Sequence, residues 1–249
     1  MKKIVFLAPL LALAACEGSI ANAVGDAATS TGTSSFSDGI AIGTSASNPG
    51  PFEGVMLSGP DNIVFTTAED FSIRAEGDAK AIEQLRYKIS GDQIKIGRDN
   101  GGMSWGDSGK ATIYVSAPSL KSAKLSGSGD MVVDAMTTDT TKLSIAGSGN
   151  IRVAKIETVS LSSQIAGSGN LNLAGTAESI DISIAGSGNI SGKDLNAASV
   201  SISVAGSGDV ELSSDGLVDA KVMGSGDVRI HGDAKCKSRS MGSGDITCS

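Results

Sequence analysis

The feature that most constrains the fold is a Gly-Ser-Gly triplet that recurs seven times in the second half of the chain. The triplets begin 20, 20, 19, 20, 18 and 18 residues apart, and each is followed by Asp or Asn and then by an apolar residue. A fixed period near 20 residues is typical of a solenoid. The repeated glycines are Gly127 and Gly129, Gly147 and Gly149, Gly167 and Gly169, Gly186 and Gly188, Gly206 and Gly208, Gly224 and Gly226, and Gly242 and Gly244.

Apolar and polar residues alternate ahead of most triplets, as in residues 143–146 (LSIA) and 182–185 (ISIA). This period of two predicts strands with one buried face, which a single strand cannot bury alone. Coils stacked about 4.8 Å apart would place each inward residue above its counterpart in the next coil. We therefore predict an all-β fold, a single-stranded right-handed parallel β-helix with coils of 18–20 residues.

The triplets are predicted to be the corners of this solenoid. A tight corner that stacks on itself favours glycine, which reaches positive φ and leaves room for the coil above. The Asp or Asn that follows is suited to hydrogen-bond neighbouring backbone groups. Asn150, Asn170 and Asn189 are expected to stack as an amide ladder.

Residues 51–249 are predicted to form one β-helix domain, with 51–120 as its N-terminal end and 121–249 as the repeat array. A short helix is expected between Asp78 and Tyr87, because Asp78 suits an N-cap and Ile82 and Leu85 lie three residues apart. Trp105 lies in a Gly-rich loop, where packing at the end of the solenoid is favoured over contact with a partner.

The first 15 residues are predicted to be a lipoprotein signal peptide. Lys2 and Lys3 precede an apolar stretch at 4–15 that is too short to span a bilayer. Residues 13–16 (LAAC) resemble a lipobox, which implies cleavage before Cys16 and acylation of that residue. An ordinary secretory signal with a chance cysteine is the alternative, and both interpretations export the chain.

Residues 16–50 are predicted to be the acylated cysteine and a disordered linker, because Ala, Ser, Thr and Gly dominate them. Glu17, rather than Asp, after the acylated cysteine favours the outer membrane. The predicted location is thus the cell envelope, with the membrane as a partner through the lipid anchor. Which face of that membrane carries the protein is left open.

Charge and cysteine content narrow the partners further. Without Lys2 and Lys3 the chain has 18 basic and 27 acidic residues, a net charge of about −9 with His neutral, which argues against nucleic-acid binding. In an oxidising compartment Cys236 and Cys248 are predicted to form a disulfide that closes the last coil; two buried thiols are the alternative. Two cysteines with few His neighbours do not suit a metal site, and no cofactor is expected.

With these motifs the sequence resembles the putative auto-transporter adhesin head domain family, also called the GIN domain. The resemblance covers about residues 52–249. It is carried by residues 57–60 (LSGP), residues 115–120 (VSAPSL) and the Gly-Ser-Gly-Asp/Asn-apolar unit. It implies an envelope-associated β-helix without defined catalytic residues, and fold alone does not supply a function.

A non-enzymatic, adhesin-like structural or binding module is the favoured function, with a protein or glycan partner unidentified and end-to-end self-association open. A polysaccharide-acting β-helix enzyme is one alternative. Sugar sites favour aromatic platforms and paired carboxylates, yet residues 121–249 contain no Phe, Trp or Tyr. His231, the sole histidine, is expected in a solvated turn, and no Ser/His/Asp group stands out.

A calcium-binding repeat protein is the other alternative. Asp209, Asp227 and Asp245 follow successive triplets and should stack on consecutive coils. Stacked carboxylates are weak candidates for Ca²⁺ ligands. Solvated corner carboxylates, screened by water and salt, are the interpretation that we favour.

Overall fold

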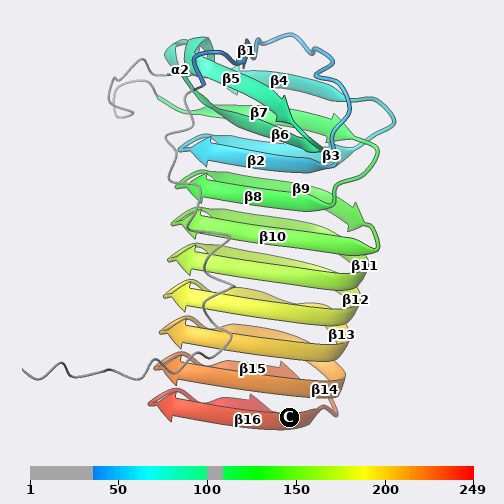
Figure 1. The fold of residues 1–249 in the computed structure, drawn as a ribbon, viewed down its shortest axis with the longest axis vertical. Coiled ribbons are helices and arrows are strands. Elements are labelled where there is room, and N and C mark those ends of the chain that lie inside the picture. Colours follow the sequence, from blue (N-terminus) through cyan, green and yellow to red (C-terminus); the bar gives the residue numbers. More distant parts are fainter. Residues whose placement is uncertain (1–35, 100–108) are drawn as a thin grey trace, which may run out of the picture.

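The computed structural model describes residues 36–99 and 109–249. Its strands join into one sheet of 17 strands that winds as a parallel β-solenoid of about 6 turns, with coils about 20 residues apart (Figure 1). The spacing of the triplets thus predicted both the fold class and the length of each coil correctly.

Each coil of the array has two walls that face each other across the core. Strands that run toward a Gly-Ser-Gly corner form the incoming wall, and strands that leave the corner form the outgoing wall. The longest strands bend and belong to both. The array strands are β8 (Ser122–Gly127), β9 (Asp130–Thr137), β10 (Thr140–Gly147), β11 (Asn150–Gly167), β12 (Asn170–Gly186), β13 (Ile190–Gly206), β14 (Val210–Gly224), β15 (Val228–His231), β16 (Lys235–Gly242) and β17 (Ile246–Cys248).

Alternate residues of both walls point inward and form a continuous apolar column. On the incoming wall, Ile145 lies in register with buried residues of the next four coils, namely Ile165, Ile184, Val204 and Val222. Burial of one such side chain stabilises the fold by roughly 1.5–3 kcal/mol before the entropy cost. Stacking thus turns a weakly apolar sequence into one core.

The N-terminal end departs from the repeat by adding antiparallel strands beyond the last parallel layer. Two parallel layers come first, followed by three antiparallel pairings. The elements are β1 (Ile40–Ala41), β2 (Gly54–Gly59), β3 (Asn62–Thr67), β4 (Ser72–Gly77), α2 (Ala79–Gln84), β5 (Leu85–Ser90), β6 (Gln93–Arg98) and β7 (Ala111–Ala117). The short helix expected near Asp78 is confirmed, but it ends at Gln84 because the chain continues as a strand.

The predicted linker is wrong over its last part. Phe36 and Ile42 are buried, and the segment between them pairs with β5. The Phe36 ring packs on Gly97, where a Cβ atom would lie 2.3 Å from the ring. Two apolar anchors therefore hold a segment whose average composition is polar. Residues 1–35, which include Cys16 and the predicted signal peptide, lie outside the described residues.

A buried ion pair joins the first corner to the N-terminal end. Arg98 donates to Asp61 through Nε at 2.6 Å and Nη2 at 2.5 Å, and the side chains are 0% and 1% exposed. Asp61 also accepts from the amide of Ala111 at 2.9 Å. Removal of one partner from such a pair typically costs 3–5 kcal/mol, because a buried charge is left uncompensated. The sequence analysis did not identify this pair.

Candidate functional site

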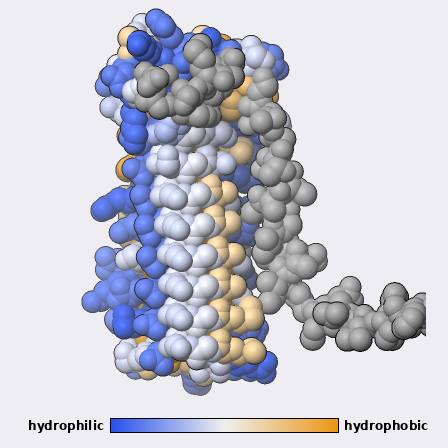
Figure 2. All heavy atoms as spheres, turned by 90° about the vertical axis from the view of Figure 1, so that its left-hand side faces the viewer, coloured by the Kyte–Doolittle hydropathy of each residue, from blue (hydrophilic) through white to orange (hydrophobic). Residues whose placement is uncertain are grey.

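The predicted corner glycines stack along one side of the solenoid, where the Gly-Ser-Gly triplets form the pale stripe in Figure 2. The first glycine of each triplet has φ between 130° and 139°, a conformation that side chains disfavour. The second glycine is needed for space. A Cβ atom on Gly169 would lie 2.2 Å from the carbonyl oxygen of Gly149 in the preceding coil.

The Asp or Asn after each corner forms a hydrogen-bonded ladder beside this stripe. The Oδ1 atom of each residue except the last, Asp245, accepts from the backbone amide of its counterpart in the next coil, at 2.8–3.2 Å. The side-chain amides of Asn150, Asn170 and Asn189 also donate to the Oδ1 atom of the ladder residue in the preceding coil. The ladder consists of Asn62, Asp130, Asn150, Asn170, Asn189, Asp209, Asp227 and Asp245.

The sequence analysis predicted the Asn stack but missed the first rung. Residues 59–62 (GPDN) form a corner, with Gly59 in register with Gly127 and the Asp130 amide 3.0 Å from Asn62 Oδ1. Pro60 and Asp61 stand where later corners have Ser and Gly. A search for Gly followed three residues later by Asn or Asp would have found it.

At the acidic end of the ladder, two carboxylates accept hydrogen bonds from the backbone of the next coil. Asp209 accepts from the Asp227 amide at 2.8 Å, and Asp227 accepts from the Asp245 amide at 2.9 Å. Within residues 36–99 and 109–249, no group of three or more His, Cys, Asp or Glu side chains is placed to hold a metal ion. Backbone hydrogen bonds therefore give the carboxylates of Asp209 and Asp227 a structural role.

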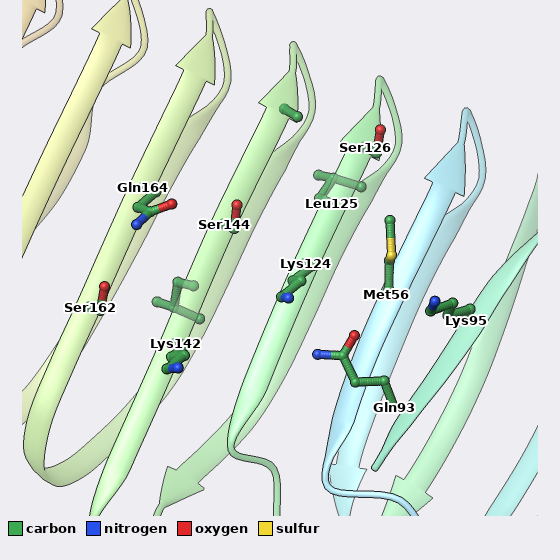
Figure 3. Close-up of a pocket in the computed structure, with 12 residues that line it drawn as sticks. Met56, Gln93, Lys95, Lys124, Leu125, Ser126, Lys142, Ser144, Ser162 and Gln164 are labelled. Carbon is green, nitrogen blue, oxygen red and sulfur yellow. The ribbon is translucent and has the colours of Figure 1, made fainter. Parts of the chain in front are cut away.

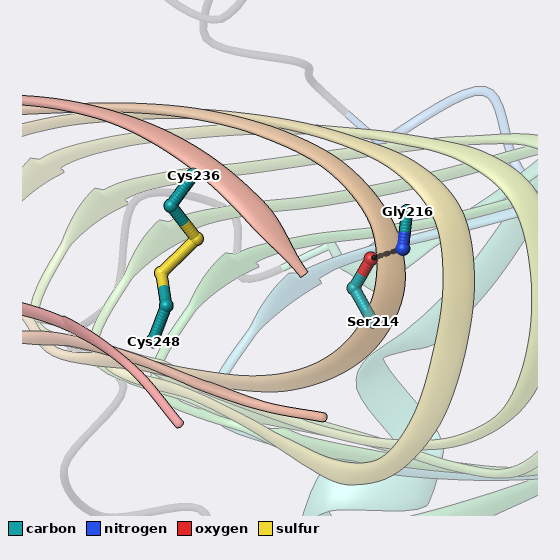
Figure 4. Close-up of a disulfide and its surroundings, with 4 residues drawn as sticks. All are labelled: Ser214, Gly216, Cys236 and Cys248. Atoms are coloured by element: carbon teal, nitrogen blue, oxygen red, sulfur yellow. Dashed lines mark hydrogen bonds between the residues drawn. A yellow bond between two sulfur atoms is a disulfide. The ribbon is translucent and has the colours of Figure 1, made fainter. Parts of the chain in front are cut away.

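Cys236 and Cys248 are joined by a disulfide, with their Cα atoms 6.7 Å apart (Figure 4). The bond links β16 on the incoming wall to β17 on the outgoing wall. Cys236 is in register with buried Val218, so it points inward, yet it is exposed because β16 is the last strand of its wall in the described chain. The disulfide thus closes the coil in which the apolar column ends.

His231 ends β15 and faces a neighbouring carboxylate. Its Nε2 atom lies 2.8 Å from Glu211 Oε1 in the preceding coil. This hydrogen bond lowers the pKa of Glu211 below its ordinary value. His231 is therefore a half-buried partner of a carboxylate at the end of a strand, rather than the solvated turn residue that we expected.

A shallow groove of about 330 Å³ crosses the incoming wall beside the N-terminal end (Figure 3). It extends over β6, β2, β8, β10 and β11, which are consecutive neighbours in the sheet. Lys95, Lys124 and Lys142 contribute three ammonium groups to it. Its neutral polar lining includes Gln93, Ser126, Ser144, Ser162 and Gln164.

The sequence analysis did not find this groove. Lys124 and Lys142 are 18 residues apart, two fewer than the 20-residue coil in this part of the array. The repeat period therefore places them on adjacent strands, two positions out of register, and was an available signal for that pair. Lys95 could not be assigned in the same way, because it precedes the repeats and reaches the groove through the pairing of β6 with β2.

The sequence of the solenoid matches a known protein family. A family model described as "Putative auto-transporter adhesin, head GIN domain" matches residues 51–234. The chain belongs to this family. The resemblance inferred from the repeats is thereby confirmed. No curated protein matches the sequence.

Solved structures share the fold of this GIN domain. A putative adhesin from Bacteroides fragilis is 22% identical, with a TM-score of 0.75 and coverage of 82% of this chain and 95% of its own. A putative lipid binding protein from Parabacteroides distasonis is 21% identical, with a TM-score of 0.65 and the same coverage. A putative adhesin from Parabacteroides merdae is 18% identical, with a TM-score of 0.60 and coverage of 84% and 96%.

Two predicted features of the GIN-domain protein lie outside the described residues, namely the lipidation site Cys16 and the loop residue Trp105. In the part of the chain that the structure describes, no helix is long and apolar enough to cross a membrane.

Proposed function

We propose that this GIN-domain protein is a non-enzymatic, adhesin-like binding module of the bacterial cell envelope, held at the outer membrane through Cys16. The leader at 1–15 and the lipobox support export and acylation. Two or three acyl chains give durable anchoring where one would be marginal. Membership of a family described as an adhesin head supports a binding role for the folded body.

The observation that carries the proposal is the groove on the incoming wall. Its lining combines polar side chains with apolar ones such as Met56 and Ala146, and it opens to solvent. It crosses five adjacent strands, so it suits an extended partner outside the solenoid. The interior offers a ligand little room, because apolar side chains fill it from Val55 to Ile230. The lipid-binding name of one solved relative therefore does not favour an interior lipid site in this chain.

An enzymatic role has less support from the geometry. The His231–Glu211 pair could orient a general base, but such a base needs a nucleophile or a substrate proton within hydrogen-bond reach. Within the described residues, no hydroxyl or thiol is hydrogen-bonded to His231. The residues that line the groove include no carboxylate for acid catalysis of glycoside cleavage.

Cells that express the full chain test the proposal directly. A clickable palmitate analogue should label the wild type and not the Cys16→Ser variant, and the label should fractionate with the outer membrane. Wild-type cells should also adhere to glycan- or protein-coated surfaces more strongly than cells that lack the chain. Absence of both label and adhesion would refute the proposed function.

A further inference from the structure

We propose that the lysine groove binds a linear acidic glycan, meaning a polysaccharide that carries carboxylate or sulfate groups. The inference rests on the proposed binding function and names the chemical class of its ligand. The lysine groove is the surface formed by Lys95, Lys124 and Lys142 with their neutral neighbours Gln93, Ser144, Ser162 and Gln164.

The three ammonium groups are not neutralised by the described protein. Other lysines of the protein form ion pairs, such as Lys121 with Glu53 at 2.7 Å and, on the outgoing wall, Lys155 with Glu157 at 3.1 Å. Lys95, Lys124 and Lys142 form no ion pair with any residue in 36–99 or 109–249. On a chain of net charge −7, they create a local positive patch that attracts an anion.

Partial burial makes this patch more selective than a set of mobile surface lysines. Lys95 and Lys124 are half-buried, and both lie in register with Met56 on the strand between them. Their aliphatic stems therefore rest on the wall while the ammonium groups face the groove. Less side-chain entropy is lost when such groups bind a ligand.

The placement of the lysines favours a linear polymer over a small anion. Lys95 and Lys124 lie two strands apart, a separation of about 10 Å, and Lys124 and Lys142 lie diagonally on adjacent strands, about 7–8 Å apart. This spread along the solenoid axis suits several acidic groups in a row better than a single carboxylate. The groove spans five strands, or about 19 Å along the solenoid axis, so its ligand must cross the strands.

The neutral residues favour a glycan among polyanions. The side chains of Ser144, Ser162 and Gln164 both donate and accept hydrogen bonds, as sugar hydroxyls require. Acidic side chains elsewhere on the protein repel a phosphate polymer, whose charge density is high and whose affinity would rest on phosphate contacts alone. An anionic lipid would add an acyl chain, whereas the apolar part of the lining, which includes Met56 and Ala146, lies on a shallow open surface rather than in an enclosed slot.

The test compares two variants that lose the same charge. The groove variant is K95Q/K124Q/K142Q, and the matched control is K80Q/K193Q/K235Q, which changes three exposed lysines outside the groove. Both should keep the wild-type melting midpoint within a few degrees. Full-length protein in detergent is titrated with oligogalacturonate, dextran sulfate, neutral dextran, single-stranded DNA and vesicles of anionic lipid.

We expect an acidic glycan to bind the wild type and the control, with affinity that falls as salt rises. The groove variant should bind it at least about tenfold more weakly. Equal loss in both variants, no loss in either, or preference for DNA or lipid vesicles over acidic glycans would overturn the inference. If wild-type and groove-variant cells adhere equally well, the groove inference fails while the proposed adhesive function stands.

Discussion

The side-chain oxygen of Asn150 accepts two hydrogen bonds from Asn170, one from its backbone amide at 3.2 Å and one from its side-chain amide at 2.8 Å. Asn170 repeats the arrangement with Asn189, at 3.2 and 3.1 Å. An Asp in place of Asn keeps the side-chain oxygen that accepts these bonds but lacks the side-chain amide that donates to the preceding coil. The ladder therefore links neighbouring coils through side chains, in addition to the main-chain sheet.

Replacement of Asn170 by Ala should destabilise the protein by about 1–2 kcal/mol, because it removes an acceptor and a donor, each worth a net 0.5–1.5 kcal/mol. N170D should cost less, since it preserves the acceptor for the Asn189 amide. Urea unfolding of both variants measures the difference. Equal losses in the two variants would show that the backbone bond to the side-chain oxygen does not contribute.

Two adjacent residues of one corner, Ser168 and Gly169, should respond very differently to substitution by Ala. G169A places a methyl group against the Gly149 carbonyl oxygen, so backbone must move, and we expect a loss of about 1–3 kcal/mol or more. S168A changes an exposed side chain and should stay within about 0.5 kcal/mol of the wild type. Thermal or urea unfolding measures the free energy of unfolding of both variants. Similar losses for the two variants would contradict close stacking at the second glycine.

The three aspartates at the end of the ladder place like charges on adjacent coils. D227N keeps the oxygen that accepts from the Asp245 amide and removes the central charge, so it should stabilise the protein by about 0.2–1 kcal/mol at low salt. The gain should shrink in high salt. D181N, which removes an exposed charge outside the ladder, is the control. A Ca²⁺-dependent stabilisation lost in D227N would instead favour cation binding.

Among the buried hydroxyl groups of the described residues, that of Ser163 is the one without a hydrogen-bond partner. Ser163 lies in register between Leu143 and Ile182, is 0% exposed, and its Oγ has no hydrogen-bond partner among the described residues. Because an unpaired buried hydroxyl is unfavourable, S163A should raise the unfolding free energy by about 1 kcal/mol. The exposed change S201A should have no such effect. A destabilised S163A would indicate that the hydroxyl is satisfied in solution.

The disulfide should stabilise the last coil more than the protein as a whole, because contacts in a solenoid are made mainly between neighbours. In the C236S/C248S variant, amide hydrogen exchange should accelerate across residues 235–248 and stay nearly unchanged in β11 and β12. The local loss should be about 2–4 kcal/mol. Titration of the denatured wild type should find neither Cys236 nor Cys248 as a free thiol. Uniform acceleration along the whole solenoid would contradict local closure.

The repeat determined how much could be predicted. Where each coil reproduces the last, as from Gly127 to Gly242, the spacing predicted the strands, the corners and the Asn stack. Prediction failed for most contacts between segments of the N-terminal end that are far apart in sequence. The Phe36 ring on Gly97 and the pairing of Lys95 with Met56 join segments that no period relates. Such contacts depend on the complete packing of the N-terminal end, which local alternation does not encode.

Asn62 and Asp130 are neighbouring rungs 68 residues apart in sequence, whereas later rungs are 18–20 apart. Chain-closure entropy grows with the logarithm of the enclosed length, so formation of the first coil costs about 1 kcal/mol more than that of any later one. We therefore expect folding to nucleate in the array, with β2 and β3 docking afterwards onto an existing coil. Since synthesis begins at the N-terminus, the strands that the ribosome makes first should be among the last to fold, because they pair with coils that are synthesised later.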